Sequence, residues 1–480
     1  MSQTRRILKN ATALYVAEFV SRAMTLVLTI LVARTLGSTE YGKLALVLSV
    51  MAIAQNLTDF GFSTLGVKLI ANEPGAVNRI GSAMLVLKVA LGVVTSGAII
   101  VIVLLAGVPG DLAWIFVFNS LTLVTLAYTT SMSSIYRGHE IMQFDAYGRT
   151  GIAFLTTAVG ALLISSGHGV VAISALTLAL TFVNALYMKS VNDRQRLFRF
   201  EWPRSTQEYG PLLKQALPFA VLAVLVAVSF RVDALILGLF ESTTAVGEYS
   251  AAYRVFELLL IVPAIFAGVL LPTTSARLNS DKASAHSLTM IAIRYFTYLC
   301  FPLAIGVALL AGPLITLVYG NEYPGSIIVL QIMSFTVIPT FISSLTANII
   351  HASSRPQHNT YIALFNVIFN VSLNLILVPI LGLRGAAITS LATQTIGLVI
   401  GTVLIARHVF VLPYWLAIWR PILASLVMAG VIVAFTSLWL LPVYIIVYAV
   451  TLYALRAFSK RDQEILREAL PARRRGTVST

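Results

Sequence analysis

Charged residues and cysteine are both scarce in this chain. Only 11% of its 480 residues are charged, while 58% are hydrophobic; soluble domains have about 25% charged and about 45–50% apolar residues. This balance excludes a soluble enzyme. The only cysteine, Cys300, lies within an apolar stretch, so the sequence excludes a disulfide framework and a cysteine metal cluster.

The motifs of nucleotide-binding and zinc enzymes are missing as well. No G-x-x-x-x-G-K-[ST] loop for ATP occurs, and no H-E-x-x-H zinc motif occurs. The six histidines are scattered over expected loops and helix ends: His139, His168, His286, His351, His358 and His408. We therefore expect no catalytic residues, no metal site and no bound cofactor, and we keep coupling to Na⁺ or H⁺ open.

Long apolar runs, in contrast, dominate the chain. A membrane-spanning helix needs about 20 apolar residues, and short polar or Gly/Pro turns separate fourteen apolar runs. Their approximate limits are 11–36, 44–70, 80–108, 112–135, 148–164, 170–188, 217–240, 249–271, 289–310, 327–350, 361–381, 385–406, 422–440 and 443–455. The sequence predicts an all-α integral membrane protein with about 14 transmembrane helices. Because the last two runs are short, twelve spans plus a re-entrant hairpin is the alternative.

The basic residues indicate orientation in the membrane. The formal net charge is +14, from 33 lysines and arginines. If the N-terminus is cytoplasmic, most of them fall in cytoplasmic loops, tails or adjacent helix ends, and only Lys43 and Arg384 fall in outside loops. This bias predicts a multi-pass protein of the cell inner membrane with both termini in the cytoplasm. It also excludes nucleic acid as a partner. We expect Arg473–Arg475 to meet anionic lipids, with solvent as the alternative.

A weak internal repeat divides the chain. Val20–Gly42 and Val228–Ser250 align without gaps and share six identical positions. Parallel order of the two copies predicts two pseudo-symmetric six-helix bundles around a central cavity, followed by two extra helices. The expected limits are 1–209 for the first bundle with its basic cytoplasmic linker, 210–420 for the second, and 421–480 for the extra helices and a basic tail.

Charged side chains within the apolar runs are candidate functional residues, because a charge at mid-membrane costs about 2.5–3.5 kcal/mol on insertion scales. Arg22 lies four residues after Glu18, and Arg254 three residues before Glu257, so a simple ion pair within each helix is the alternative to function. The cations Arg22, Arg231, Arg254 and Lys88 are our candidates for substrate binding. The acids Glu18, Asp59, Asp233 and Glu257 are candidates for coupling or charge pairing.

A stripe of asparagines adds polar groups to one run. Asn366, Asn370 and Asn374 recur every four residues, which places them on one face of a helix. They could hydrogen-bond the hydroxyls of a sugar substrate. The alternative is hydrogen bonding between helices, at about 0.6 kcal/mol each in membranes.

Several short motifs in this order resemble those of a known family. They are VSR at Val20–Arg22, VARTLG at Val32–Gly37, GEYSAAYR at Gly247–Arg254 and GLRGAA at Gly382–Ala387. The chain resembles the polysaccharide-biosynthesis flippases, the Wzx-type exporters of the MOP superfamily, which includes the MATE transporters.

That resemblance implies a fold and a function. It implies a fourteen-helix inner-membrane flippase that turns an undecaprenyl-diphosphate-linked oligosaccharide, such as an O-antigen, exopolysaccharide or capsule repeat unit, to the outer leaflet by alternating access. In the related lipid II flippases, arginines like Arg22 and Arg254 engage the diphosphate. Their second cavity arginine corresponds here to Leu28, which favours a different lipid-linked glycan.

Three alternatives remain beside this reading. A cation-coupled drug exporter of the MATE type is the nearest one. A membrane polysaccharide polymerase or ligase would need a large outer loop, whereas the longest here is near Ala311–Ser326. A scaffold for a glycan assembly complex is the third. A flippase would have a lipid-linked oligosaccharide as its substrate, with a polymerase and assembly proteins as further partners.

Overall fold

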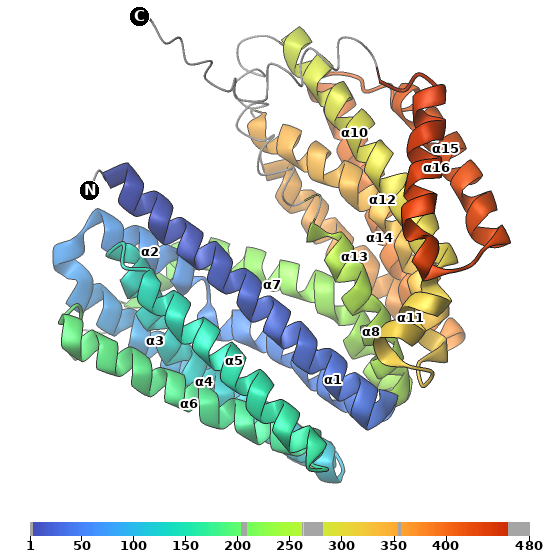
Figure 1. The fold of residues 1–480 in the computed structure, drawn as a ribbon. Coiled ribbons are helices and arrows are strands. Elements are labelled where there is room, and N and C mark those ends of the chain that lie inside the picture. The colour runs from blue at the N-terminus through green and yellow to red at the C-terminus, as the bar shows by residue number, and fades with distance from the viewer. Residues whose placement is uncertain (1–2, 203–208, 262, 264–281, 354–356, 459–480) are drawn as a thin grey trace, which may run out of the picture. The chain divides into compact units, whose positions relative to one another are not determined.

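The computed structural model describes residues 3–202, 209–261, 263, 282–353 and 357–458, and all regular structure in those ranges is helical (Figure 1). Within them, eleven helices are long and apolar enough to cross a membrane, and Leu438–Ala454 is a shorter apolar helix. The chain is therefore an all-α membrane protein, as predicted. The basic tail from residue 459 onward and the end of the run 249–271 lie outside the described residues.

The helices form two compact units. The first comprises Met1–Ala251, Val318–Gly325 and Val367–Ala386, and the second comprises Ala252–Leu317, Ser326–Asn366 and Ala387–Thr480. The boundaries predicted from the internal repeat stay a prediction.

The first unit contains the helices from the N-terminal part of the chain. They are α1 (Gln3–Asp59), α2 (Phe62–Asn72), α3 (Val77–Leu105), α4 (Gly110–Gly138), α5 (Gln143–Ser165), α6 (Val170–Gln195), α7 (Tyr209–Phe240) and the first part of α8 (Thr243–Leu259). Helix α4 packs on α3 and α6, while α1 packs on α5 and α7 (Figure 1). Buried Phe62, Met84 and Tyr136 are central to one apolar core, and the Tyr136 hydroxyl donates to the Met188 carbonyl at 2.6 Å.

The second unit contains most of the later helices. They are α10 (Lys282–Leu309), α11 (Ala311–Tyr319), α12 (Pro324–Ala352), α14 (Leu383–His408), α15 (Trp415–Ala434), the short 3₁₀ helix Leu438–Leu440 and α16 (Leu441–Ala454). Helix α13 (Gln357–Leu381) contributes its first residues here and its later ones to the first unit. Helix α15 packs on α10 and α16. Tyrosines join them, since the Tyr448 hydroxyl donates to the Tyr298 carbonyl at 2.8 Å.

Two glycines interrupt the long first helix and its continuation. Gly37 has φ 81° and ψ 175°, so α1 consists of two helical stretches joined by a kink. Phe60 (φ 47°) and Gly61 (φ 75°) then separate α1 from α2. Such left-handed backbone favours glycine because glycine has no Cβ. The apolar run 44–70 is therefore broken in its C-terminal half, which hydropathy did not indicate.

The second stretch of α1 and the start of α8 approach each other closely, in a contact that we call the glycine seam. A Cβ on Gly42 would lie 1.7 Å from the Thr243 carbonyl oxygen, and a Cβ on Gly247 would lie 2.0 Å from that of Ser38. At its centre the Thr39 and Thr244 hydroxyls, 205 residues apart in the sequence, lie 2.8 Å apart. Gly42 thus approaches Thr243 in the same way that Gly247 approaches Ser38. The contacts of the seam are therefore related by a local two-fold symmetry.

Candidate functional site

Arg22 lies at the end of a series of ion-paired side chains in the first unit, in which arginines and carboxylates alternate. Its Nε donates to Glu18 Oε1 at 2.8 Å, and its side chain is 79% exposed. Glu18 Oε2 lies 3.7 Å from Arg149 Nη1. Asp145, which is buried, then accepts from Arg149 Nε at 2.9 Å and from Arg137 Nη2 at 2.9 Å. These three arginines and two carboxylates carry one net positive charge.

Arg137, Asp145 and Arg149 are charged residues of this series that the sequence did not single out, and Arg149 is the one that contacts Glu18. It lies in α5, whereas Glu18 and Arg22 lie in α1. Spacing along one helix predicts the pairing of Arg22 with Glu18, but a contact between helices leaves no such pattern. The packing of α1 on α5 brings Arg149 to the carboxylate.

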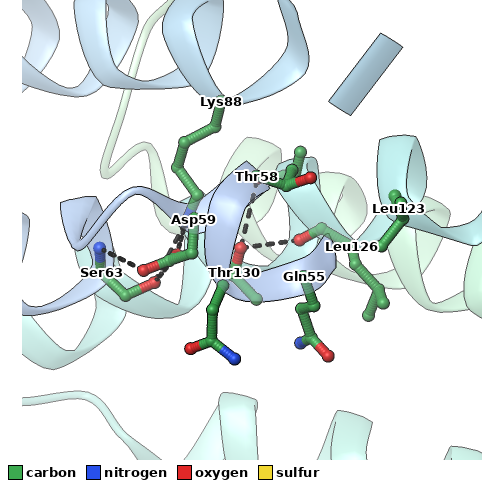
Figure 2. Close-up of a pocket in the computed structure, with 10 residues that line it drawn as sticks. Gln55, Thr58, Asp59, Ser63, Lys88, Leu123, Leu126 and Thr130 are labelled. Carbon is green, nitrogen blue, oxygen red and sulfur yellow. Dashed lines mark hydrogen bonds and ion pairs between the residues drawn. The ribbon is translucent and has the colours of Figure 1, made fainter. Parts of the chain in front are cut away.

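A second polar centre is the ion pair of Asp59 and Lys88 (Figure 2). Lys88 Nζ lies 2.7 Å from Asp59 Oδ1, and the Lys88 side chain is fully buried. The ammonium also donates to Ser63 Oγ at 3.0 Å, and the Ser63 hydroxyl donates to Asp59. The lysine charge is thus compensated within the first unit.

The break between α1 and α2 positions this pair. Asp59 is the last residue of α1 and Ser63 lies in the first turn of α2. Asp59 Oδ2 accepts from the Ser63 backbone N–H at 3.3 Å, so the carboxylate satisfies an amide at the start of the new helix. Lys88 belongs to α3 and reaches Asp59 from the helix drawn above it (Figure 2).

The pair forms one wall of a cavity of about 260 Å³, which we call the Asp59 pocket. The segment around Asp59, helix α3 and helix α4 line it. The lining residues are Gln55, Asn56, Thr58, Asp59, Ser63, Lys88, Leu123, Leu126, Ala127 and Thr130.

A third polar centre surrounds Asp233 of α7. Its Oδ2 accepts from the Tyr249 hydroxyl at 2.7 Å, and its Oδ1 accepts from Asn374 Nδ2 at 2.6 Å. The same Asn374 amide lies 3.1 Å from Asn370 Oδ1. All four residues are buried, and Asn374 Oδ1 has no hydrogen-bond partner within the described part of the chain. The sequence singled out three of these residues but did not connect them.

The remaining candidates lie elsewhere. Asn366 belongs to the second unit, where its amide faces Gly397, so the asparagine stripe is divided between the units. Arg254 Nη1 pairs with Glu257 Oε2 at 2.9 Å within α8, as their spacing allows. Arg231 is half-buried in α7, two residues before Asp233.

Metal-binding clusters are absent from the residues that the structure describes: no group of three or more histidine, cysteine, aspartate or glutamate side chains there could hold a metal ion. The polar centres consist instead of ion pairs and of neutral hydroxyl and amide groups.

Two protein-family models match the sequence. One, described as "Polysaccharide biosynthesis protein", matches residues 7–278, and another, described as "Lipid II flippase MurJ", matches residues 144–459.

Two curated proteins of Haloferax volcanii are similar to the chain. "Probable flippase AglR" is 28% identical over 255 residues, which cover 50% of this chain and 53% of that protein, so the chain spans about half the length of this relative. "Probable low-salt glycan biosynthesis flippase Agl15" is 22% identical over 414 residues, which cover 85% of each chain.

Solved structures share the fold. A structure described as "Lipid II flippase MurJ, inward closed conformation" superposes with a TM-score of 0.77 at 15% identity, covering 94% of this chain and 99% of that one. An inward-facing multidrug resistance MATE family transporter of the MOP superfamily gives 0.60 at 15% identity, covering 87% and 96%. At this identity the likeness concerns the fold alone.

Proposed function

Because this chain belongs to the polysaccharide biosynthesis protein family of MOP-superfamily flippases, we propose that it moves an undecaprenyl-diphosphate-linked oligosaccharide across the cytoplasmic membrane by alternating access. The observation that carries the proposal is that two family models, for polysaccharide biosynthesis proteins and for a lipid II flippase, together extend from residue 7 to residue 459. The relatives AglR and Agl15 are described as flippases too. In this proposal the termini are cytoplasmic, anionic lipids surround the basic inner surface, and a polymerase with its assembly proteins receives the product.

Arg22 is the group that we propose to meet the diphosphate first. Its hydrogen bond to Glu18 uses Nε, which leaves the outer Nη groups of an exposed guanidinium for phosphate oxygens. A guanidinium binds phosphate through two parallel hydrogen bonds. Glu18 is shared with Arg149, so an arriving diphosphate could displace one carboxylate and meet two guanidinium groups. Arg231 and Arg254 would bind the phosphates at other stages of the transport cycle.

Asp233 is the group that we propose to couple transport to an ion gradient. Two of the hydrogen bonds that its oxygens accept come from a hydroxyl and an amide, and buried Asn374 Oδ1, which has no hydrogen-bond partner within the described residues, lies beside it. Carboxylate and amide oxygens suit Na⁺, and a buried carboxylate can instead take up a proton. If this proposal is right, Asp233→Asn abolishes the dependence of flipping on an imposed Na⁺ or H⁺ gradient.

The flippase proposal is tested with purified protein in liposomes that contain a fluorescent undecaprenyl-diphosphate oligosaccharide. Flipping is measured as the lipid fraction that an impermeant quencher reaches. Loss of one charge-assisted contact is worth about 1.5–3 kcal/mol, or about 10- to 100-fold. We expect Arg22→Ala to lower the rate by at least about tenfold, and Arg22→Lys to restore part of it because lysine lacks the planar fork.

Arg407→Ala is the matched control, because Arg407 is exposed in the last turn of α14 and makes no proposed contact with substrate. Wild-type rates in this control support the assignment. Absence of flipping by the wild-type protein, together with export of cationic dyes, would overturn the proposal in favour of a drug exporter.

A further inference from the structure

The Asp59 pocket has no assigned ligand, although it combines a cavity with polar groups of the protein interior. Its volume of about 260 Å³ is slightly smaller than the about 300–1,000 Å³ that is typical of pockets for drug-sized ligands. The buried Thr58 hydroxyl at its wall has no hydrogen-bond partner within the described residues. Gln55, which also lines the pocket, is exposed, and its side-chain amide has both a donor and an acceptor.

The charges of the pocket indicate that its ligand is neutral. Asp59 and Lys88 are 2.7 Å apart and share Ser63, so they cancel and leave no net charge to attract a phosphate or an ammonium. The other polar groups are the hydroxyls of Thr58 and Thr130 and the amides of Gln55 and Asn56. The Thr130 hydroxyl donates to the Leu126 carbonyl and the Asn56 amide to the Ala52 carbonyl, so these two groups offer the pocket their acceptor oxygens. Amides and hydroxyls both donate and accept hydrogen bonds, which suits a ligand that has many hydroxyls.

The shape of the lining indicates a ligand with two unlike sides. Asp59 and Ser63 lie at one end of the pocket, and Leu123 and Leu126 lie at the other (Figure 2). A sugar ring has this character, because its hydroxyls form hydrogen bonds while its C–H groups pack on apolar side chains. The cavity has room for one such ring and not for an oligosaccharide.

We propose that the Asp59 pocket binds one neutral sugar ring of the lipid-linked glycan and thereby selects the substrate by its sugar. This inference rests on the proposed function as a lipid-linked glycan flippase. In this proposal arginines bind the diphosphate, whereas Gln55 and Thr130, which line the pocket with the Asp59–Lys88 ion pair, bind the sugar.

The experiment compares the affinity of the purified protein for undecaprenyl diphosphate with that for the same lipid bearing glucose, galactose or N-acetylglucosamine. We expect at least one sugar-bearing lipid to bind about tenfold more tightly than the sugarless lipid. Thr130→Val, which removes a hydroxyl at constant volume, should reduce this preference by about fivefold, as expected for one hydrogen bond. Gln55→Leu should do the same, and its exposed position protects the fold from the change.

Thr129→Val is the matched control. Thr129 is the neighbouring residue of α4, is buried, and its hydroxyl donates to the Leu126 carbonyl, but it does not line the pocket. Retention of the sugar preference in this variant, with its loss in Thr130→Val and Gln55→Leu, supports the proposal.

Two other outcomes separate the two proposals. If the wild-type protein binds all the lipids equally and neither variant changes this, the sugar pocket is overturned while the flippase proposal stands. If the wild-type protein binds none of these lipids, the flippase proposal itself is overturned, and the pocket proposal with it.

Discussion

The Asp59–Lys88 ion pair places a fully buried cation against a carboxylate that is 25% exposed. Removing one partner of such a pair leaves an uncompensated buried charge, at a cost of about 3–5 kcal/mol. We expect Asp59→Ala to lower the free energy of unfolding by that amount. The double variant Asp59→Ala with Lys88→Met should recover most of the loss, because no buried charge remains.

Cys300 offers a direct measurement of this effect. It is the only cysteine and is fully buried, so a thiol-reactive dye labels it when the protein unfolds on heating. Equal labelling temperatures for the wild-type protein and Asp59→Ala would show that the pair contributes nothing to stability.

Individual pairs were predictable from the sequence only where both partners lie on one helix. The spacing of Arg254 and Glu257 allowed the contact that the structure contains. The contacts of Lys88 with Asp59 and of Arg149 with Glu18 join different helices. Almost every face of these helices is apolar, so hydropathy does not tell which faces pack together.

The glycine seam between α1 and α8 depends on two backbones that leave no room for a side chain. A Cβ on Gly42 would lie 1.7 Å from a carbonyl oxygen, so the helices would have to separate. Overpacking of this kind costs about 1–3 kcal/mol. We therefore expect Gly42→Ala to lower the temperature of Cys300 labelling.

Gly151→Ala is the control for the seam. Gly151 is an exposed residue within α5, and a Cβ there meets nothing within 4 Å. Alanine at such a position stabilises a helix by about 0.4–1 kcal/mol. A destabilised Gly151→Ala, or an unchanged Gly42→Ala, would contradict the role that we give to the seam.

Tyr323, which precedes α12, ties this segment to α1. Its buried hydroxyl donates to the Ala33 carbonyl at 2.6 Å, and burial raises the pKa of the phenol, with nearby Tyr41, Glu322 and Glu248 adding to the rise. A raised pKa in the folded state contributes stability that is complete below the unfolded pKa of about 10 and is lost as the pH rises above it.

We expect the wild-type protein to lose more stability than Tyr323→Phe between pH 9 and pH 11, because phenylalanine has no proton to lose. Unfolding by denaturant at each pH, followed by tryptophan fluorescence, measures the difference. Parallel losses in the two proteins would contradict the prediction.

Helices were predictable from the sequence, whereas their interruptions were not. Each of the fourteen apolar runs coincides at least in part with a described helix. The break at Phe60–Gly61 falls inside an apolar run, and hydropathy measures apolar content rather than backbone conformation. Yet this break places Asp59 and Ser63 beside Lys88, so the candidate pocket depends on the feature that the sequence pattern missed.

The molecule as a whole follows the fold of the MOP-superfamily transporters, with a TM-score of 0.77 to a lipid II flippase at only 15% identity. So low an identity allows the fold to persist while the polar residues within it change. The sequence could therefore indicate the family from hydropathy, charge bias and the order of a few motifs. It could not specify the substrate, which depends on side chains that meet only after folding.

If the chain works by the alternating access that we propose, helices must separate at one face of the membrane while they meet at the other. With a cytoplasmic N-terminus, the glycine seam lies at the outer face, and Thr39 and Thr244 meet there with their hydroxyls 2.8 Å apart. We expect a cross-link between Thr39→Cys and Thr244→Cys, in a Cys300→Ser background, to lower the flipping rate at least about tenfold. A reducing agent should restore the rate.

The control cross-link joins Thr125→Cys and Thr181→Cys, whose native hydroxyls lie 3.0 Å apart between α4 and α6. Both helices lie within the predicted first bundle, residues 1–209, which we expect to move as a body, so this cross-link should leave flipping unchanged. If both cross-links stop flipping, rigidity in general explains the loss. If the seam cross-link leaves the wild-type rate, the seam does not open during transport, and the outer exit must lie elsewhere.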